Sequence, residues 1–214
     1  MDEERAIIDS TTRNEKIKNF FIEYKKKLII LFLVFILILF SYFIYGDLQK
    51  KNKKDLANRY NLSSTNFILG NKINIQKELI SIIREKDQTY SPLALYFLID
   101  NNIIKEKIVI NELFDILINE TGLEREIKNL VIYKKGLFNS DSSAENELIE
   151  ILNPLINSES VWKSHALNLL AEYFYFKDEK QKAKEFFEKI LTVENGNSSL
   201  KIEAQKRLTR DFSD

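Results

Sequence analysis

The sequence predicts an all-α protein in which a single N-terminal transmembrane helix is followed by a series of helical hairpins. Three observations predict this fold class. An uncharged apolar run occupies residues 28–45, the apolar residues beyond it recur with a helical period, and the 214 residues include only 5 glycines and 2 prolines. Because sandwiches and barrels of strands need many tight turns, this scarcity favours helices joined by short connections.

The composition excludes several classes of function. Lysine plus arginine and aspartate plus glutamate both number 32, so no net charge favours a nucleic-acid partner. There is no cysteine, which excludes disulfides, iron–sulfur clusters, thiolate zinc sites and cysteine nucleophiles. The one histidine, His165, has no neighbours that would complete a metal site, and no phosphate-binding loop or nucleophile–base pair is present. The sequence therefore predicts a protein that is not an enzyme, with no metal, no cofactor and no small-molecule substrate.

The apolar run LIILFLVFILILFSYFIY at residues 28–45 predicts a membrane-spanning helix. Its eighteen residues would extend about 27 Å, close to the thickness of a hydrocarbon core. Tyr42 and Tyr45 stand at its far end, where amphipathic rings suit the membrane interface. A cleaved signal peptide is the alternative, but the preceding 27 residues carry acids, the run is too long, and no small-residue cleavage site follows.

The charges that flank this run predict its orientation. Residues 1–27 hold seven basic residues and residues 46–59 hold five, and the triple lysine 25–27 adjoins the run directly. Because basic residues are retained in the cytoplasm, residues 1–27 are expected to be a cytoplasmic tail. The abundance of Lys, Asn and Ile suggests an AT-rich bacterial genome. We therefore expect a single-pass protein of the bacterial inner membrane with its C-terminal domain in the periplasm.

Beyond a stem and first helix at residues 46–73, four segments place apolar residues at helical spacing. They are residues 74–86, 107–119, 144–156 and 180–191. Start signals fall between them at intervals of about 15–20 residues. Ser91 is a candidate N-cap before Pro92, Thr121 precedes Glu124 as a candidate capping box, and Ser142 precedes Glu145 in the same way. The elements therefore form two-helix units of about 35 residues.

A period near 34 in helix–turn–helix units is typical of the tetratricopeptide repeat, in which stacked hairpins bury what one hairpin cannot. The clearest repeat covers residues 161–194. Ala171 and Ala183 are twelve residues apart, where only small side chains let two helices approach, and Asp178 takes a turn position that often holds glycine. The predicted repeat-packing residues are Leu170, Ala171, Phe174, Ala183, Phe187 and Ile190. We expect degenerate tetratricopeptide-like hairpins over residues 74–198 and a C-terminal capping helix over residues 199–214.

Four consecutive aromatics, Tyr173 to Phe176, lie in the first helix of this repeat. Phe174 takes the packing position between the two helices. The helix face toward the superhelical groove then carries His165, Asn168, Glu172, Tyr175 and Phe176. Two interpretations remain open: these residues bind a partner as an exposed apolar patch, or the capping helix covers the rings as core.

The tail beginning DEER, the lysine-bounded anchor and the segment VWKSHALNLLAEYFYFKDEKQKAKEFFEKIL at 161–191 together resemble a known family. They are similar to the bacterial tetratricopeptide-like membrane proteins related to YfgM, an ancillary subunit of the SecYEG translocon. The family's motif at the last repeat stands here as Trp162, Ala166, Leu169, Leu170 and Ala171. The resemblance covers the architecture of the whole chain and specific motifs only over about residues 160–210, and this chain is richer in Phe, Ile and Lys than its relatives.

The resemblance implies a non-catalytic periplasmic domain whose partners are translocon subunits, periplasmic chaperones and exported polypeptides. The expected function is a membrane-anchored protein–protein interaction module that helps to handle exported chains. The alternative is a non-catalytic scaffold for another cell-envelope assembly, such as a cell-wall or division complex.

Overall fold

The computed structural model describes residues 2–68 and 72–212, with side chains from residue 18 onward except at 21, 68, 72 and 73. These residues form helices and no strand, which confirms the predicted all-α class. The chain divides into two compact units, Met1–Asp55 and Leu56–Asp214. Residues 1, 69–71 and 213–214, which belong to the predicted tail, stem and capping segments, lie outside the described residues.

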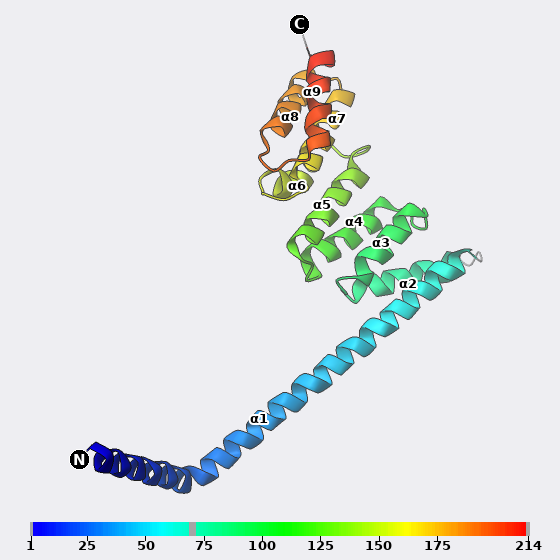
Figure 1. The fold of residues 1–214 in the computed structure, drawn as a ribbon. Coiled ribbons are helices and arrows are strands. Elements are labelled where there is room, and N and C mark those ends of the chain that lie inside the picture. Colours follow the sequence, from blue (N-terminus) through cyan, green and yellow to red (C-terminus); the bar gives the residue numbers. More distant parts are fainter. Residues whose placement is uncertain (1, 69–71, 213–214) are drawn as a thin grey trace. The chain divides into compact units, whose positions relative to one another are not determined.

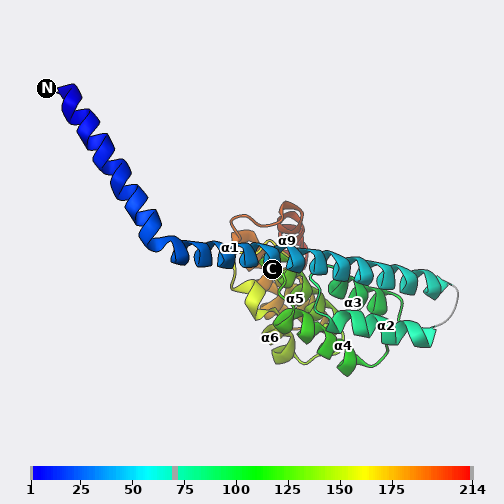
Figure 2. The ribbon, with the colours of Figure 1, turned by 90° about the horizontal axis from the view of Figure 1, so that it is seen from below.

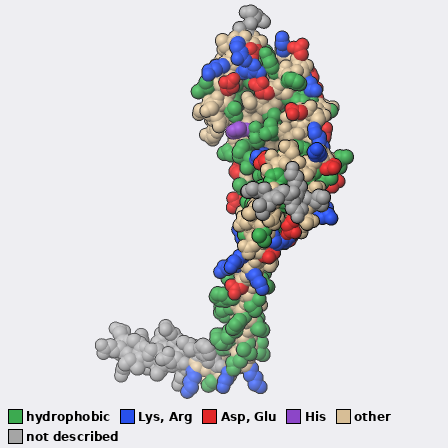
Figure 3. All heavy atoms as spheres, turned by 90° about the vertical axis from the view of Figure 1, so that its right-hand side faces the viewer, with side chains coloured by type: hydrophobic (Ala, Val, Ile, Leu, Met, Phe, Trp, Pro, Cys, Tyr) green, Lys and Arg blue, Asp and Glu red, His purple; other side chains and the backbone are tan. Residues whose placement is uncertain are grey.

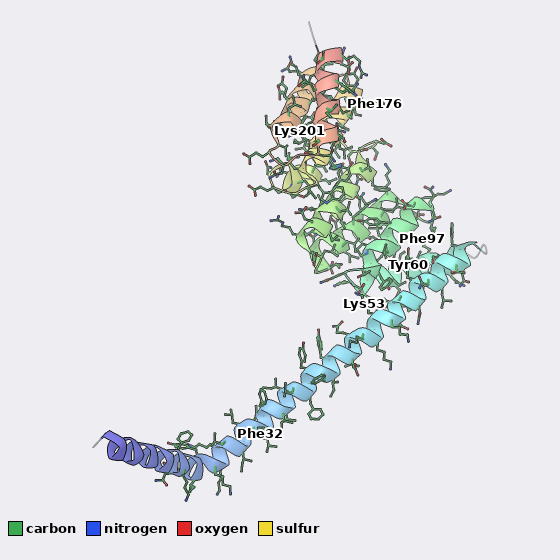
Figure 4. All side chains as sticks on the ribbon, viewed as in Figure 1. Phe32, Lys53, Tyr60, Phe97, Phe176 and Lys201 are labelled. Atoms are coloured by element: carbon green, nitrogen blue, oxygen red, sulfur yellow. The ribbon has the colours of Figure 1, made fainter. Side chains whose placement is uncertain are left out.

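The first unit consists of most of helix α1 (Asp2–Ile68), which contains the predicted span. Within the described residues, this is the one helix that is long and apolar enough to cross a membrane. Its side chains over 28–45 are largely exposed, as Phe32 is at 62% (Figure 4). On the face seen in Figure 3, hydrophobic side chains cover this stretch and basic side chains lie next to it. An apolar helix surface without protein neighbours is the form that lipid requires.

The second unit begins with the last turns of α1 and continues as a succession of short helices (Figures 1 and 2). Connections between them are short, as the scarcity of glycine and proline predicts. Their bounds are α2 Lys72–Arg84, α3 Tyr90–Asp100, α4 Lys107–Asp115, the π-helical turn η1 Ile116–Glu120, α5 Arg125–Asn139, α6 Glu145–Ile156, α7 Lys163–Phe176, α8 Lys180–Thr192 and α9 Ser198–Asp211.

Two hydrophobic clusters form the core of the second unit, and they meet at α5. The first cluster runs from Leu56 to Val131 and the second from Ile132 to Ala204. Val131 and Ile132 are neighbours in sequence but belong to different clusters, because successive helical residues point about 100° apart. Helix α5 therefore joins the two halves of the unit.

Helices α2, α4 (continued by η1), α6 and α8 each bury three residues at the same spacing, four and then three positions apart. These triplets are Ile75, Leu79 and Ile82 on α2; Ile110, Phe114 and Leu117 on α4 and η1; Leu148, Leu152 and Leu155 on α6; and Ala183, Phe187 and Ile190 on α8. Successive triplets begin 35, 38 and 35 residues apart (110 − 75, 148 − 110, 183 − 148). The same face of each such helix is therefore buried along the unit.

In the pairs α5–α6 and α7–α8, the first helices α5 and α7 also bury corresponding positions, which are 35 residues apart in the sequence. Four of the buried residues of α5 are Asn129, Ile132, Gly136 and Asn139. Those at the corresponding positions of α7 are Ser164, Leu167, Ala171 and Phe174. At Gly136 an added Cβ would lie 2.5 Å from Cδ2 of Leu152, so α5 and α6 approach closely where Ala171 stands in the next pair.

The helix starts differ from the predicted capping boxes. Helix α5 begins after Glu124, and the hydroxyl of Thr121 donates to the carbonyl oxygen of Ile116 at 3.2 Å instead of capping α5. Helix α6 begins after Ala144, while Ser142 Oγ accepts from Lys107. Both predicted boxes are therefore wrong, because each hydroxyl is engaged by a neighbouring turn or helix.

The start of α3 also differs from its prediction. The carboxylate of Asp87 accepts from the backbone N–H groups of Thr89 and Tyr90 at 2.8 and 2.7 Å, whereas Ser91 donates to the carbonyl oxygen of Ile82 at 2.9 Å. Asp87 therefore takes the capping role that the sequence assigned to Ser91. Pro154 lies in the last turn of α6, which ends two residues later.

Candidate protein-binding surfaces

The six predicted repeat-packing residues all lie in the second core cluster, where each is completely buried. They are Leu170, Ala171 and Phe174 on α7, and Ala183, Phe187 and Ile190 on α8. The ring of Phe174 stacks on Phe186 with centroids 5.4 Å apart. In the turn between the two helices, Asp178 adopts a positive φ of 59°, the conformation that favours glycine or aspartate. Figure 1 shows α7, α8 and α9 side by side at this end of the unit.

The four consecutive aromatics occupy four different environments. Phe174 is completely buried, and Tyr173 is nearly so, with its hydroxyl donating to the carbonyl oxygen of Ser143 at 3.0 Å. Burial raises the pKa of the Tyr173 hydroxyl above its ordinary value. Tyr175 is half-buried, whereas Phe176 is 86% exposed and points away from the helices in Figure 4.

Helix α9 covers part of the face that the sequence assigned to a partner. The guanidinium of Arg207 lies 4.1 Å from the ring centroid of Tyr175 and pairs with Glu172 at 2.7 Å. The ring of Phe212 meets Tyr175 edge-on at 6.0 Å. Glu172 and Tyr175 are therefore engaged by the C-terminal helix, as the second of the two interpretations expects.

His165 and Asn168, at the other end of this face, are half-buried beside an aromatic cluster. The imidazole lies 5.2 Å from the ring of Trp162 and 5.8 Å from that of Tyr133, and these two rings stack at 5.6 Å. His165 Nδ1 and Asn168 Oδ1 are buried without a hydrogen-bond partner among the described residues. Of the five residues predicted for partner binding, Phe176 is thus the one with a large free apolar surface.

The start of α7 is tied to α5 by a carboxylate. Glu126 Oε2 accepts from the hydroxyl of Ser160 at 2.7 Å, and Ser160 Oγ accepts from the backbone N–H of Trp162 at 3.1 Å. The hydrogen bond from Ser160 holds the pKa of Glu126 below its usual value. The backbone N–H of Val161 and the charge of Arg125 lower this pKa to a smaller extent. This arrangement positions the Trp162–His165 cluster.

A second surface, which sequence reasoning missed, is a groove between α4 and α6 with a volume of about 690 Å³. Its first wall comes from α4 and η1, its floor includes Ile132 and Lys135 of α5, and its second wall comes from α6. We call this feature the α4–α6 groove. The first wall presents Ile108, Asn111, Glu112, Asp115, Ile118 and Asn119, and the second presents Glu147, Glu150, Ile151 and Pro154.

The α4–α6 groove combines acidic side chains with apolar ones. Lys135 Nζ contacts Asp115 Oδ1 at 2.7 Å, which neutralises one of its four carboxylates. Glu112, Glu147 and Glu150 have no ion-pair partner among the residues that the structure describes. Asp115 and Glu147 each adjoin a buried residue of their helix in sequence, but nothing local predicts that α4 and α6 face each other.

The described residues include no group of three or more His, Asp or Glu side chains that could hold a metal ion. What both surfaces offer is contact with another molecule: an exposed ring on α7, and a groove with apolar and acidic walls. Comparison with known proteins gave no significant match to any family model, curated protein or solved structure.

Proposed function

We propose that this chain is a membrane-anchored, non-catalytic protein–protein interaction module whose hairpins form a tetratricopeptide-type solenoid. The observation that carries the proposal is the shared 35-residue register of the pairs α5–α6 and α7–α8. Both pairs bury corresponding positions, with Gly136 and Ala171 where the first helix meets the second. Repeats of this kind create extended surfaces whose common use is to bind polypeptides.

The anchor and its flanking charges support a location for the module. The lysine-bounded span at residues 28–45 favours a bacterial inner-membrane protein with a cytoplasmic N-terminus and a periplasmic C-terminal domain. The resemblance to the YfgM-related family supports association with the Sec translocon and periplasmic chaperones in handling exported polypeptides. In this proposal Phe176, exposed beside the covered Tyr175, is a contact point for such partners.

A scaffold for a cell-wall or division complex is the alternative function. The same anchor and hairpins would serve it, because both roles require only that one membrane protein hold others nearby. The two proposals differ in the partners that contact the second unit, so partner identity is the discriminating measurement.

Topology is the first experiment. An epitope placed after Asp214 is expected to be accessible to protease in intact spheroplasts of a bacterial host. Protection of that epitope in spheroplasts, with cleavage after lysis, would place the repeats in the cytoplasm and contradict the proposal.

Crosslinking follows if the epitope is accessible. A photoreactive residue replacing Phe176 is expected to capture translocon subunits or exported chains. The control position is Ile202, which is also exposed but lies on α9. Capture of cell-wall or division proteins from Phe176 would select the scaffold, and equal capture from both positions would show that the contact is not specific.

A further inference from the structure

We propose that the α4–α6 groove binds a basic, amphipathic polypeptide segment, an inference that rests on the proposed function as a protein-interaction module. The observations that carry it are the shape of the groove, the apolar residues along its floor and walls, and the uncompensated carboxylates on both walls.

The groove has the dimensions of a short segment of chain. From Ile108 to Asn119 its first wall extends roughly 16 Å, at about 1.5 Å per helical residue. A ligand of that length is about three turns of helix, or about five residues of extended chain. Ile108, 76% exposed, stands at one end of this wall, so the entrance offers an apolar contact as well.

Apolar side chains continue through the groove. Ile118 lies farther along the first wall, Ile132 forms part of the floor, and Ile151 with Pro154 lies on the second wall. Ile132 is already buried in the core, but a stripe of apolar residues along a bound segment would cover Ile118, Ile151 and Pro154 and remove them from water. This is the helix-in-groove mode of recognition, in which one apolar face supplies the anchors.

The charges determine the polar face of that segment. Four carboxylates and one lysine give the groove a net charge of −3 (−4 + 1), although the whole chain has a net charge of zero. Glu112 stands on one wall, and Glu147 and Glu150 stand on the other, so lysine or arginine side chains on either flank of a bound segment would meet an acid. Electrostatic complementarity of this kind selects partners and increases the association rate.

The same charges exclude other ligands. Carboxylates on both walls repel the phosphates of nucleic acid and of anionic lipid headgroups. A small polyamine would satisfy the acids but would leave the isoleucines uncovered. A segment that carries both basic and apolar residues matches both properties of the groove.

The test uses the full chain in nanodiscs of zwitterionic lipid and two fluorescent peptides of 14 residues. The peptides share an apolar stripe at helical spacing. All positions outside the stripe are lysine in one peptide and glutamate in the other. Fluorescence anisotropy is expected to show that the lysine peptide binds, that salt weakens its binding, and that the glutamate peptide does not bind.

Matched variants locate the binding site. The double substitution E147Q/E150Q removes two groove carboxylates, both exposed, and should weaken the lysine peptide about three- to ten-fold. The control E188Q/E203Q removes two exposed carboxylates from α8 and α9 and should leave binding unchanged. Fluorescence of Trp162, which stacks on Tyr133, verifies that each variant keeps its fold.

A third variant tests the apolar contact. Ile108→Ser should weaken the lysine peptide but not spermidine, a polyamine that competes for charge without covering isoleucine. Equal binding of the two peptides, or an unchanged affinity in E147Q/E150Q, would overturn the inference. Binding of spermidine without binding of the lysine peptide would also overturn it and would make the groove a polyamine site.

Failure of this inference and failure of the proposed function give different results. If a crosslinker at Phe176 captures specific protein partners while the lysine peptide does not bind, the groove inference is contradicted and the proposed interaction module is supported. If the peptide does not bind and Phe176 captures no specific partner, both fall.

Discussion

Consecutive aromatic residues of α7 contact different parts of the protein. Successive side chains point about 100° apart, so four consecutive rings cannot share one environment. Phe174 points into the core, Tyr173 reaches the carbonyl oxygen of Ser143, Tyr175 lies beneath Arg207, and Phe176 faces solvent. The aromatic run is therefore explained by contacts on three sides of α7, and one ring remains exposed.

Gly136 is the residue whose replacement should most directly disturb a helix crossing. An added Cβ would lie 2.5 Å from Cδ2 and 3.0 Å from Cγ of Leu152, which is completely buried. We expect Gly136→Ala to lower the free energy of unfolding by about 1 kcal/mol, because overpacking outweighs the gain in helix propensity. Denaturation of the full chain in detergent, followed by Trp162 fluorescence, measures this change.

Gly122→Ala is the control for that substitution. The nearest atom to its added Cβ is Gln88 Nε2 at 3.6 Å, an ordinary van der Waals distance. Its effect should remain within about 0.5 kcal/mol. Equal effects of the two substitutions would show that α5 and α6 do not approach closely at Gly136.

At the scale of elements, Arg207 links α9 to the preceding pair by ion pairs as well as by packing. This buried guanidinium pairs with Glu172 of α7 and Asp211 of α9, each at 2.7 Å, and lies over the rings of Tyr175 and Phe187. A helix whose polar side faces water and whose other side covers the last pair is what the proposed solenoid would require at its end.

Arg207→Ala should therefore loosen α9. We expect a loss of about 2–4 kcal/mol, because the change leaves Asp211 and Glu172 without this partner and removes packing from two rings. Trypsin should then cleave faster within α9, for example after Lys201 (Figure 4). The matched change Arg210→Ala alters an exposed arginine that pairs with its sequence neighbour Asp211 at 2.7 Å, and it should leave the cleavage rate nearly unchanged. Equal cleavage of both variants would contradict this account.

The link between α5 and the start of α7 should depend on pH. Because the folded pKa of Glu126 is lowered, its contribution to stability is present above the pKa of the unfolded chain and is lost as the pH falls through the folded value. We expect Glu126→Gln to reduce the decline in stability between about pH 5 and pH 3, by less than about 1 kcal/mol because the carboxylate is partly exposed. Glu188→Gln, on the exposed face of α8, is the control and should leave the decline unchanged.

At the scale of the whole molecule, the charges beside the span should determine its orientation. Replacing Lys25, Lys26 and Lys27 with glutamine would leave four basic residues on the N-terminal side against five on the other (7 − 3 = 4). We expect the variant to insert in mixed orientation, seen as partial protection of a C-terminal epitope in spheroplasts. An unchanged orientation would show that the C-terminal domain translocates regardless of these charges.

The features that the sequence predicted well are those that depend on local periodicity. An uncharged run of eighteen residues requires a helix in an apolar medium, and a spacing of four and three places Ala183, Phe187 and Ile190 on one helical face whatever that face contacts. Capping was predicted less well. The hydroxyls of Thr121 and Ser142 had competing partners, on η1 and on α4, that no local pattern displays.

By itself, the sequence determined that the protein is helical, that one segment can span a membrane, and which faces of the later helices are buried. Only the tertiary structure decided which helix each face contacts. It placed α9 over Tyr175 and brought the acids of α4 and α6 to one groove. It also gave the pair α5–α6 the same register as the pair α7–α8, although Asn139 stands where α7 has Phe174 and Leu148 stands where α8 has Ala183. The physical reason is that helical periodicity is a property of a few successive residues, whereas docking depends on the shapes and charges of segments about 35 residues apart.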